Sequence, residues 1–371
     1  MKKLYIALTI MALAVACSSN DSSESVSNDG NYDRTALLTN WADNIIIPAY
    51  TNYQAKVNVL NQNVTTFTAT PTTTNLETLR QSWVDAYKAY QHVGIFDTGK
   101  SEELYLIASS NTYPTDVIGI NTNITTCNYN FNQQIQYTRQ GFPALDYIIN
   151  GLATDDNAIV TFYSTNANAA NYKKYLTDVA AQLKTIVDAI VADWNGGYRA
   201  TFISKTNTSV SSSINQTTNN FIKNLEKDVR APKLGIPAGL FSNGTTFPDK
   251  VEAYYKKDIS KALLIEALNA SHDFFNGKYF ATDATGPSLK GYLDAVGAGG
   301  DNKLSDVINT NYTAAFSAIT PLNDNFSQQI VTDNTAAVNA YNAIQKVVVL
   351  TKLDMISALN ISIDYVDGDG D

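Results

Sequence analysis

Cysteine and histidine are scarce in this 371-residue sequence, which contains two of each. The cysteines, Cys17 and Cys127, are too few for a disulfide framework or a cysteine-rich metal site. The histidines, His92 and His272, lie far apart in the sequence. Motifs such as HExxH, GxSxG and the phosphate-binding loop are missing. The sequence therefore excludes the common zinc, serine-hydrolase and nucleotide scaffolds.

Charged residues are also few, at 16% of the chain, and acidic residues outnumber basic ones to give a net charge of −9. No run of five or more basic residues occurs anywhere. A protein that binds nucleic acid needs a basic surface to neutralise phosphates. We therefore expect no nucleic-acid partner.

The N-terminus reads MKKLYIALTIMALAVAC, in which two lysines precede an apolar run that is too short to span a bilayer. It resembles a bacterial lipoprotein signal, which predicts a signal peptide over residues 1–16 and a lipid on Cys17. The alternative is an ordinary secretory signal cut near Ala16. Residues 17–33 are polar and acidic, and we predict a disordered tether there. We therefore expect a cell-envelope protein, lipid-anchored to the outer membrane and facing the periplasm or the outside.

The rest of the chain is dominated by helical periodicity, with apolar residues at three- and four-residue steps. One clear example runs from Leu76 to Phe96, with Thr74 as the predicted N-cap and Glu77 completing a capping box. Alternating β-branched runs joined by hairpin dipeptides are missing. The pattern predicts an all-α protein whose helices pack as bundles.

Two irregular segments suggest how the chain is divided. KTNTSVSSS, at residues 205–213, interrupts the helices, and we place a domain boundary there. This gives an N-terminal helical-bundle domain over residues 34–210 and a C-terminal one over 211–371. Residues 229–249 are rich in proline and glycine and are predicted to form a long loop, a kind of segment that is often functional.

The segment GFPALDYIING, at residues 141–151, resembles the signature of the imelysin-like proteins, which is glycine, any residue, histidine, two residues and glutamate. Gly141 matches the glycine, Pro143 stands in the histidine position and Asp146 stands in the glutamate position. Further segments are similar to the family in the same order: the helix with Trp83, the pair Tyr113–Pro114, the loop with Arg230, the segment GPSLKGYLDAV and the terminal Asp-Gly-Asp ending.

The resemblance implies a secreted or outer-membrane protein made of two related helical bundles. The family is tied to bacterial iron uptake, and some members have been called metallopeptidases. Its signature histidine and glutamate are taken to form a functional site near the interface of the two domains. Iron or another divalent cation is then the candidate ligand, and components of iron or haem uptake are the candidate partners.

Pro143 breaks the signature, because proline has no ligand atom and no titratable group. One interpretation is structural: proline is favoured at the first position of a helix, and an acidic residue in the first turn is favoured by the helix dipole. The other is a modified binding site in which Asp146 acts with Arg230, or in which His92 replaces the lost imidazole. The sequence alone leaves both open.

The candidate binding residues are Gly141, Pro143, Asp146, Arg230, Trp83, Tyr87 and His92. No catalytic residue and no metal ligand is assigned. Three functions remain open. The first is a non-catalytic binding or accessory lipoprotein associated with iron acquisition. The second is a divergent metallopeptidase. The third is a surface protein that binds a host or envelope polymer through some of its 22 tyrosines.

Overall fold

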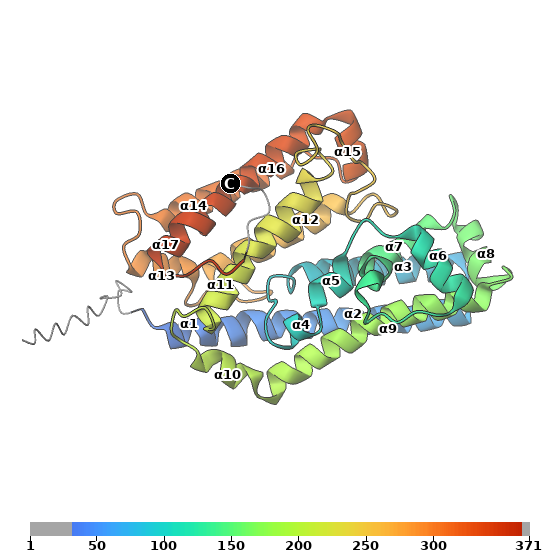
Figure 1. Ribbon diagram of the computed structural model, residues 1–371, viewed down its shortest axis with the longest axis horizontal. Coiled ribbons are helices and arrows are strands. Elements are labelled where there is room, and N and C mark those ends of the chain that lie inside the picture. The colour runs from blue at the N-terminus through green and yellow to red at the C-terminus, as the bar shows by residue number, and fades with distance from the viewer. Residues whose placement is uncertain (1–31, 366–371) are drawn as a thin grey trace, which may run out of the picture.

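The computed structural model describes residues 32–365 and is built from helices (Figure 1). No strand occurs within these residues, and a single isolated bridge joins Lys278 to Thr285. The all-α prediction is therefore confirmed. The predicted signal peptide, Cys17, the tether up to residue 31 and the terminal acidic run lie outside the described residues. No helix of residues 32–365 has the length and apolar character needed to cross a membrane.

The first half of the fold is organised around three long helices that pack side by side (Figure 1). They are α2 (Ile47–Ala69), α3 (Thr73–Gln91) and α9 (Ala169–Asp193). Each carries a buried apolar stripe, as the periodicity predicts. The shorter elements of this half are α4 (Lys100–Glu103), α5 (Leu106–Asn111), α6 (Val117–Thr126), η2 (Gln134–Arg139), α7 (Gly141–Asp146), η3 (Tyr147–Gly151), α8 (Asp156–Ser164), η4 (Trp194–Tyr198) and α10 (Arg199–Ser204).

The second half forms another helical layer, in which α14 and α16 pack on each other and α16 also packs on η5. Its helix α12 packs against α3 and so joins the two halves. The elements of this half are α11 (Ser213–Lys223), η5 (Asn224–Gly235), α12 (Ser260–Asn276), α13 (Leu289–Ala295), α14 (Leu304–Ile319), α15 (Phe326–Thr332), α16 (Asn334–Val349), η6 (Leu350–Met355) and α17 (Ile356–Ala358). Figure 1 shows this layer lying across the long helices of the first half.

The chain enters the fold through α1 (Arg34–Asn40) and η1 (Trp41–Ile46), which continue into α2 but also contact the second half. The Asn40 side chain donates a hydrogen bond to the Pro287 carbonyl at 2.9 Å. The ring of Trp41 lies 4.9 Å from that of Phe274. The first helical segment therefore bridges the two layers.

Two local predictions were wrong. The N-cap of α3 is Thr72 and not Thr74: its hydroxyl accepts from the Asn75 N–H at 3.2 Å, because Thr72 is extended and the helix starts directly after it. The predicted loop over 229–249 begins as helix, since η5 continues to Gly235 with Pro232 inside it. The wide π-type turns of η5 accommodate a residue that has no N–H to donate and that crowds the preceding turn.

Candidate functional site

The signature segment begins with a close approach of two backbones. Gly141 has φ 73°, and a Cβ placed on it would lie 2.3 Å from the Ser110 carbonyl oxygen of α5. A side chain is therefore excluded at this position by space as well as by conformation. The following residue, Phe142, stacks on Tyr87 with ring centroids 4.5 Å apart and accepts a hydrogen bond from the Trp83 indole at 3.2 Å. The structure thus brings Trp83, Tyr87 and the start of α7 together.

Pro143 is the third residue of α7, where backbone N–H groups have no partner within the helix. The helix therefore loses no hydrogen bond by having proline there. The structural interpretation predicted the first position of a helix, and Pro143 lies two residues later but within the first turn. The interpretation is wrong about Asp146, which is the last residue of α7 and does not lie in its first turn.

Asp146 is 1% exposed and accepts three hydrogen bonds. The N–H groups of Tyr255 and Lys256 each donate at 2.9 Å, and the Asn150 side chain donates at 3.0 Å. Burial raises the pKa of Asp146 to about 7, although the N–H donors favour its charged form and act against that rise. Both carboxylate oxygens are therefore engaged, and the residue ties α7 to the segment 250–257 of the second half.

Neither proposed companion of Asp146 lies beside it, since all the hydrogen bonds of its carboxylate go elsewhere. Arg230 donates to the Tyr341 hydroxyl at 2.5 Å and lies 3.9 Å from Glu226. His92 lies 3.1 Å from Glu266 in a separate surface hollow. The two pairings suggested by the sequence, Asp146 with Arg230 and Asp146 with His92, are therefore wrong.

A small cavity of about 230 Å³, here called the motif cavity, lies against the signature segment. Pro143 and Asp146 line it together with Tyr113 and with residues 249, 251 and 253–255 of the second half. Within residues 32–365 no three histidine, cysteine or acidic side chains are grouped so that they could hold a metal ion. Since Pro143 offers no ligand atom and Asp146 is engaged by N–H donors, the segment does not fit a transition metal.

A buried polar network links side chains of the two halves. The Lys233 ammonium group pairs with Glu252 and donates to the Gln91 amide oxygen at 3.0 Å. Glu252 also accepts from the Asn111 side chain at 2.8 Å, and the Asn111 oxygen accepts from the Tyr87 hydroxyl. Lys233 and Glu252 are 2% and 1% exposed, so each charge depends on the other. Burial lowers the pKa of Lys233, and Glu252 opposes that change.

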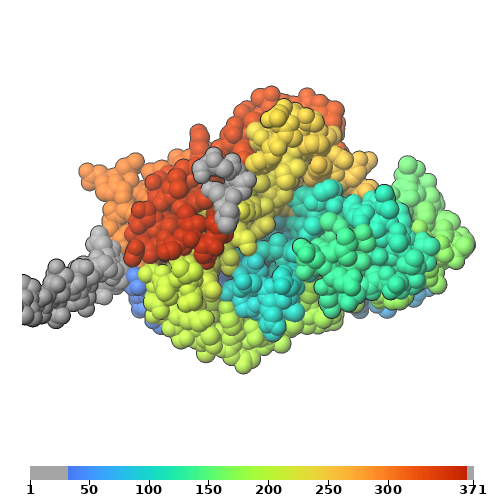
Figure 2. Space-filling model, viewed as in Figure 1, coloured from blue at the N-terminus to red at the C-terminus, as the bar shows by residue number. Residues whose placement is uncertain are grey.

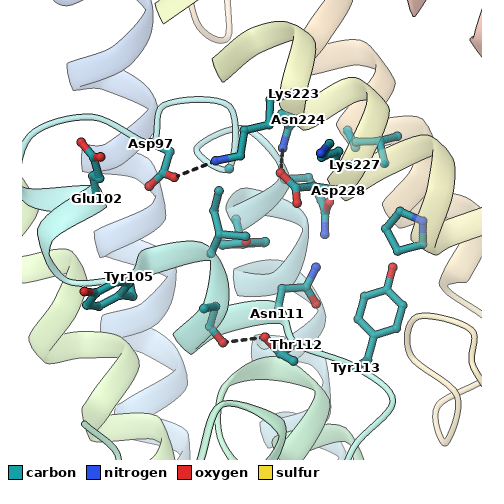
Figure 3. Close-up of a pocket in the computed structure, with 18 residues that line it drawn as sticks. Asp97, Glu102, Tyr105, Asn111, Thr112, Tyr113, Lys223, Asn224, Lys227 and Asp228 are labelled. Atoms are coloured by element: carbon teal, nitrogen blue, oxygen red, sulfur yellow. Dashed lines mark hydrogen bonds and ion pairs between the residues drawn. The ribbon is translucent and has the colours of Figure 1, made fainter. Parts of the chain in front are cut away.

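Beyond this network lies the interhalf cavity, a larger space of about 530 Å³ between the two halves (Figure 3). Its walls come from α3, α5 and the loop between them on one side, and from α11, η5 and α12 on the other. Figure 2 shows the α4–α5 segment, in cyan, facing the yellow segment of the second half across a recess. Tyr113 lines both cavities, so the motif cavity and the interhalf cavity share one side chain.

Asp228 is the most unusual charged group of the interhalf cavity. Within residues 32–365 its carboxylate has one hydrogen bond, from the Asn224 side chain at a long 3.4 Å. Burial raises the pKa of Asp228 to about 6, and nearby Lys223 opposes that rise. Lys223 itself lies 3.6 Å from Asp97. A carboxylate so weakly satisfied in a cavity wall is available to a ligand.

Sequence reasoning missed most of these residues. Asp228, Lys233 and Glu252 belong to no recognised motif. The one usable signal was the spacing of Asn224 and Asp228, which places them four residues apart on one helical face. Such a spacing recurs on every helix with polar residues, and by itself it does not show that the carboxylate faces a cavity.

Comparisons with known proteins agree on the fold. The crystal structure of a protein assigned as an iron-regulated protein A precursor from Parabacteroides distasonis aligns with a TM-score of 0.71 and 16% identity, over 88% of this chain and 95% of that one. An imelysin-like protein from Psychrobacter arcticum aligns with a TM-score of 0.66 and 16% identity, over 92% and 98% of the two chains. These likenesses show the fold.

Sequence comparison gives the same family. Iron-regulated protein A of Synechococcus elongatus is 23% identical over 237 residues, which span 60% of this chain and 60% of that protein. The chain therefore matches less than two thirds of the length of this curated relative. Residues 46–353 match the model of the family Peptidase_M75: Imelysin, which covers most of the sequence. The chain belongs to the imelysin family.

Proposed function

We propose that this protein is a non-catalytic binding protein of the cell envelope, anchored through lipid on Cys17, that serves iron acquisition. The non-catalytic role is supported by the signature segment, in which neither Pro143 nor Asp146 is available for catalysis. Pro143 provides no acid, base or ligand, and the Asp146 carboxylate is engaged by the N–H groups of Tyr255 and Lys256. A divergent metallopeptidase needs at least one of these positions to be free.

The binding part of the proposal is supported by the interhalf cavity. Its volume of about 530 Å³ falls within the range of roughly 300–1,000 Å³ that is usual for small-molecule sites. The iron part is supported by family membership and by the relative named iron-regulated protein A. The partners proposed with this role are the membrane, through the anchor, and components of iron or haem uptake.

The experiment is a deletion strain grown with and without an iron chelator and complemented with three versions of the chain. We expect a growth defect that appears under iron limitation and that the wild-type chain restores. The Cys17→Ser version should restore less growth, because the anchor is lost. Asp146→Ala, at an expression level matched to wild type, should still restore growth.

A growth defect that does not depend on iron would contradict the iron role. The non-catalytic role is tested separately with purified protein, a peptide substrate mixture and added zinc or ferrous iron. Metal-dependent cleavage that disappears in Asp146→Ala would establish the metallopeptidase alternative instead.

A further inference from the structure

The interhalf cavity combines an apolar wall with a weakly satisfied carboxylate. Its apolar lining comes from Ile107, Ala108, Val229, Pro232 and Ala267. Asp228 and Asn111 extend into the space from opposite sides (Figure 3). Such a site suits a molecule that has an apolar body and one polar end.

The charges around the cavity favour a positive polar end. Three carboxylates line it, those of Asp97, Glu102 and Asp228. The two lysines that line it are already engaged: Lys223 lies 3.6 Å from Asp97, and the Lys227 ammonium lies 5.4 Å from the ring centroid of Tyr365. Asp228 is thus left without a cation of its own at ion-pair distance in the described part of the chain.

Phenol rings provide a second feature that favours a cation. Tyr90, Tyr105 and Tyr113 all line the cavity, and the face of an aromatic ring attracts ammonium and guanidinium groups. The Tyr113 hydroxyl is buried and has no hydrogen-bond partner among residues 32–365, so it is an unused polar group in the wall. Tyr105 is 62% exposed, which places an aromatic ring at the mouth, where Glu102 is also exposed.

We propose that the interhalf cavity binds an organic cation, an ammonium or guanidinium group on an apolar chain, with Asp228 as its counter-ion. The inference rests on the proposed binding function and adds the chemical class of the ligand. A bare metal ion fits less well, since it needs several oxygen ligands and the described residues offer no grouped set of three acidic, histidine or cysteine side chains. The cation could belong to a free amine or to the lysine or arginine side chain of a protein, and the test separates these two sources.

The test is isothermal titration calorimetry of the purified protein at pH 7.5 and low salt. The probes are pentylamine, spermidine and a short peptide ending in lysine amide, with pentanoate as the anionic counterpart of pentylamine. We expect at least one ammonium probe to bind with Kd below ~1 mM, and pentanoate not to bind. Preference for spermidine or pentylamine indicates a free amine as the ligand, and preference for the peptide indicates a protein side chain.

Asp228→Asn keeps the shape of the side chain and removes its charge, so it should weaken binding at least tenfold. Asp354→Asn is the matched control: it removes one exposed negative charge elsewhere and should leave binding unchanged. Unfolding midpoints of both variants verify that they are folded. Binding to wild type should also weaken as the pH falls below about 6, where Asp228 becomes protonated.

The inference fails if none of the three ammonium probes binds the wild-type protein, or if Asp228→Asn binds them as tightly as wild type. Binding of pentanoate in preference to pentylamine also overturns it, but leaves the proposed binding function standing. The iron role is tested by the growth experiment and does not depend on either result.

Discussion

Asp146 and Asp228 are two aspartates at the same interface, and their surroundings differ in burial and in hydrogen bonding. Asp146 is buried, receives three N–H donors and ties α7 to the second half. Asp228 is half-buried, receives one donor at 3.4 Å and faces a cavity of about 530 Å³. Desolvation raises the pKa of both carboxyl groups, so the direction of the pKa shift does not distinguish them. The exposure and the hydrogen-bond partners do: they indicate that the first carboxylate is structural and the second is available to a ligand.

Lys233 and Glu252 form a buried ion pair at the same interface, and breaking this pair should have the largest effect on stability. Lys233→Met leaves the Glu252 carboxylate buried without its cation, and we expect the free energy of unfolding to fall by about 3–5 kcal/mol. Urea unfolding measures the change. Adding Glu252→Gln removes the stranded charge and should recover most of the loss. A double variant as unstable as Lys233→Met would show that packing, and not charge, dominates at this position.

Removing each aspartate in turn tests the comparison directly. Asp146→Ala leaves two backbone N–H groups without an acceptor, and we expect a loss of about 2–3 kcal/mol. Asp228→Ala removes a carboxylate with one long hydrogen bond, so stability should change by less than about 1 kcal/mol or should increase. The two unfolding midpoints, measured at pH 7.5, provide the test. Equal losses would mean that Asp228 is as structural as Asp146.

The pH dependence of stability separates the same two groups. Both carboxyls have pKa values raised above 3.8, to about 7 for Asp146 and about 6 for Asp228. Between pH 3.8 and the raised pKa of each group, the folded state therefore holds more protons than the unfolded state. The free energy of unfolding falls as the pH rises through that range. Asp228→Asn should remove the contribution of Asp228 to the fall, which runs from about pH 4 to 6, and leave the contribution of Asp146, which runs from about pH 4 to 7. Lys223, Asp97 and Lys233 also act on Asp228 and should stay unchanged in this series.

Melting temperatures of wild type and Asp228→Asn from pH 4.5 to 7.5 check this expectation. The variant should be the more stable of the two at pH 7.5, and the difference should shrink toward pH 4.5. Parallel curves over the whole range would show that Asp228 ionises in the cavity as it does in the unfolded chain.

Much of the fold followed from the sequence, because helical periodicity reports burial directly. Leu76, Leu79 and Trp83 are all fully buried on α3, as their spacing predicts. The signature segment was found through its resemblance to the imelysin-like proteins, and not through periodicity or spacing. The division of the chain at residues 210 and 211 stays a prediction.

The site was less predictable for a physical reason. Two of the three partners of Asp146 are backbone N–H groups more than a hundred residues away, and backbone groups leave no trace in a sequence pattern. Lys233 and Glu252 lie 19 residues apart in a stretch with long irregular parts, and no spacing rule connects them. Asp228 lies in helix η5, which continues through Pro232 to Gly235. Proline usually ends a helix, so the sequence did not predict this continuation.

The smallest expected effects on stability come from removing single hydroxyl groups, those of Tyr87 and Tyr113. The Tyr87 hydroxyl donates to Asn111, so Tyr87→Phe should cost about 1 kcal/mol. The Tyr113 hydroxyl has no partner in residues 32–365, so Tyr113→Phe should be neutral or slightly stabilising, because it removes a buried polar group that is not satisfied. Urea unfolding of both variants, with wild type alongside, resolves the difference. A greater loss in Tyr113→Phe than in Tyr87→Phe would show that the Tyr113 hydroxyl already has a partner such as a bound water, and would place the polar side of the interhalf cavity elsewhere.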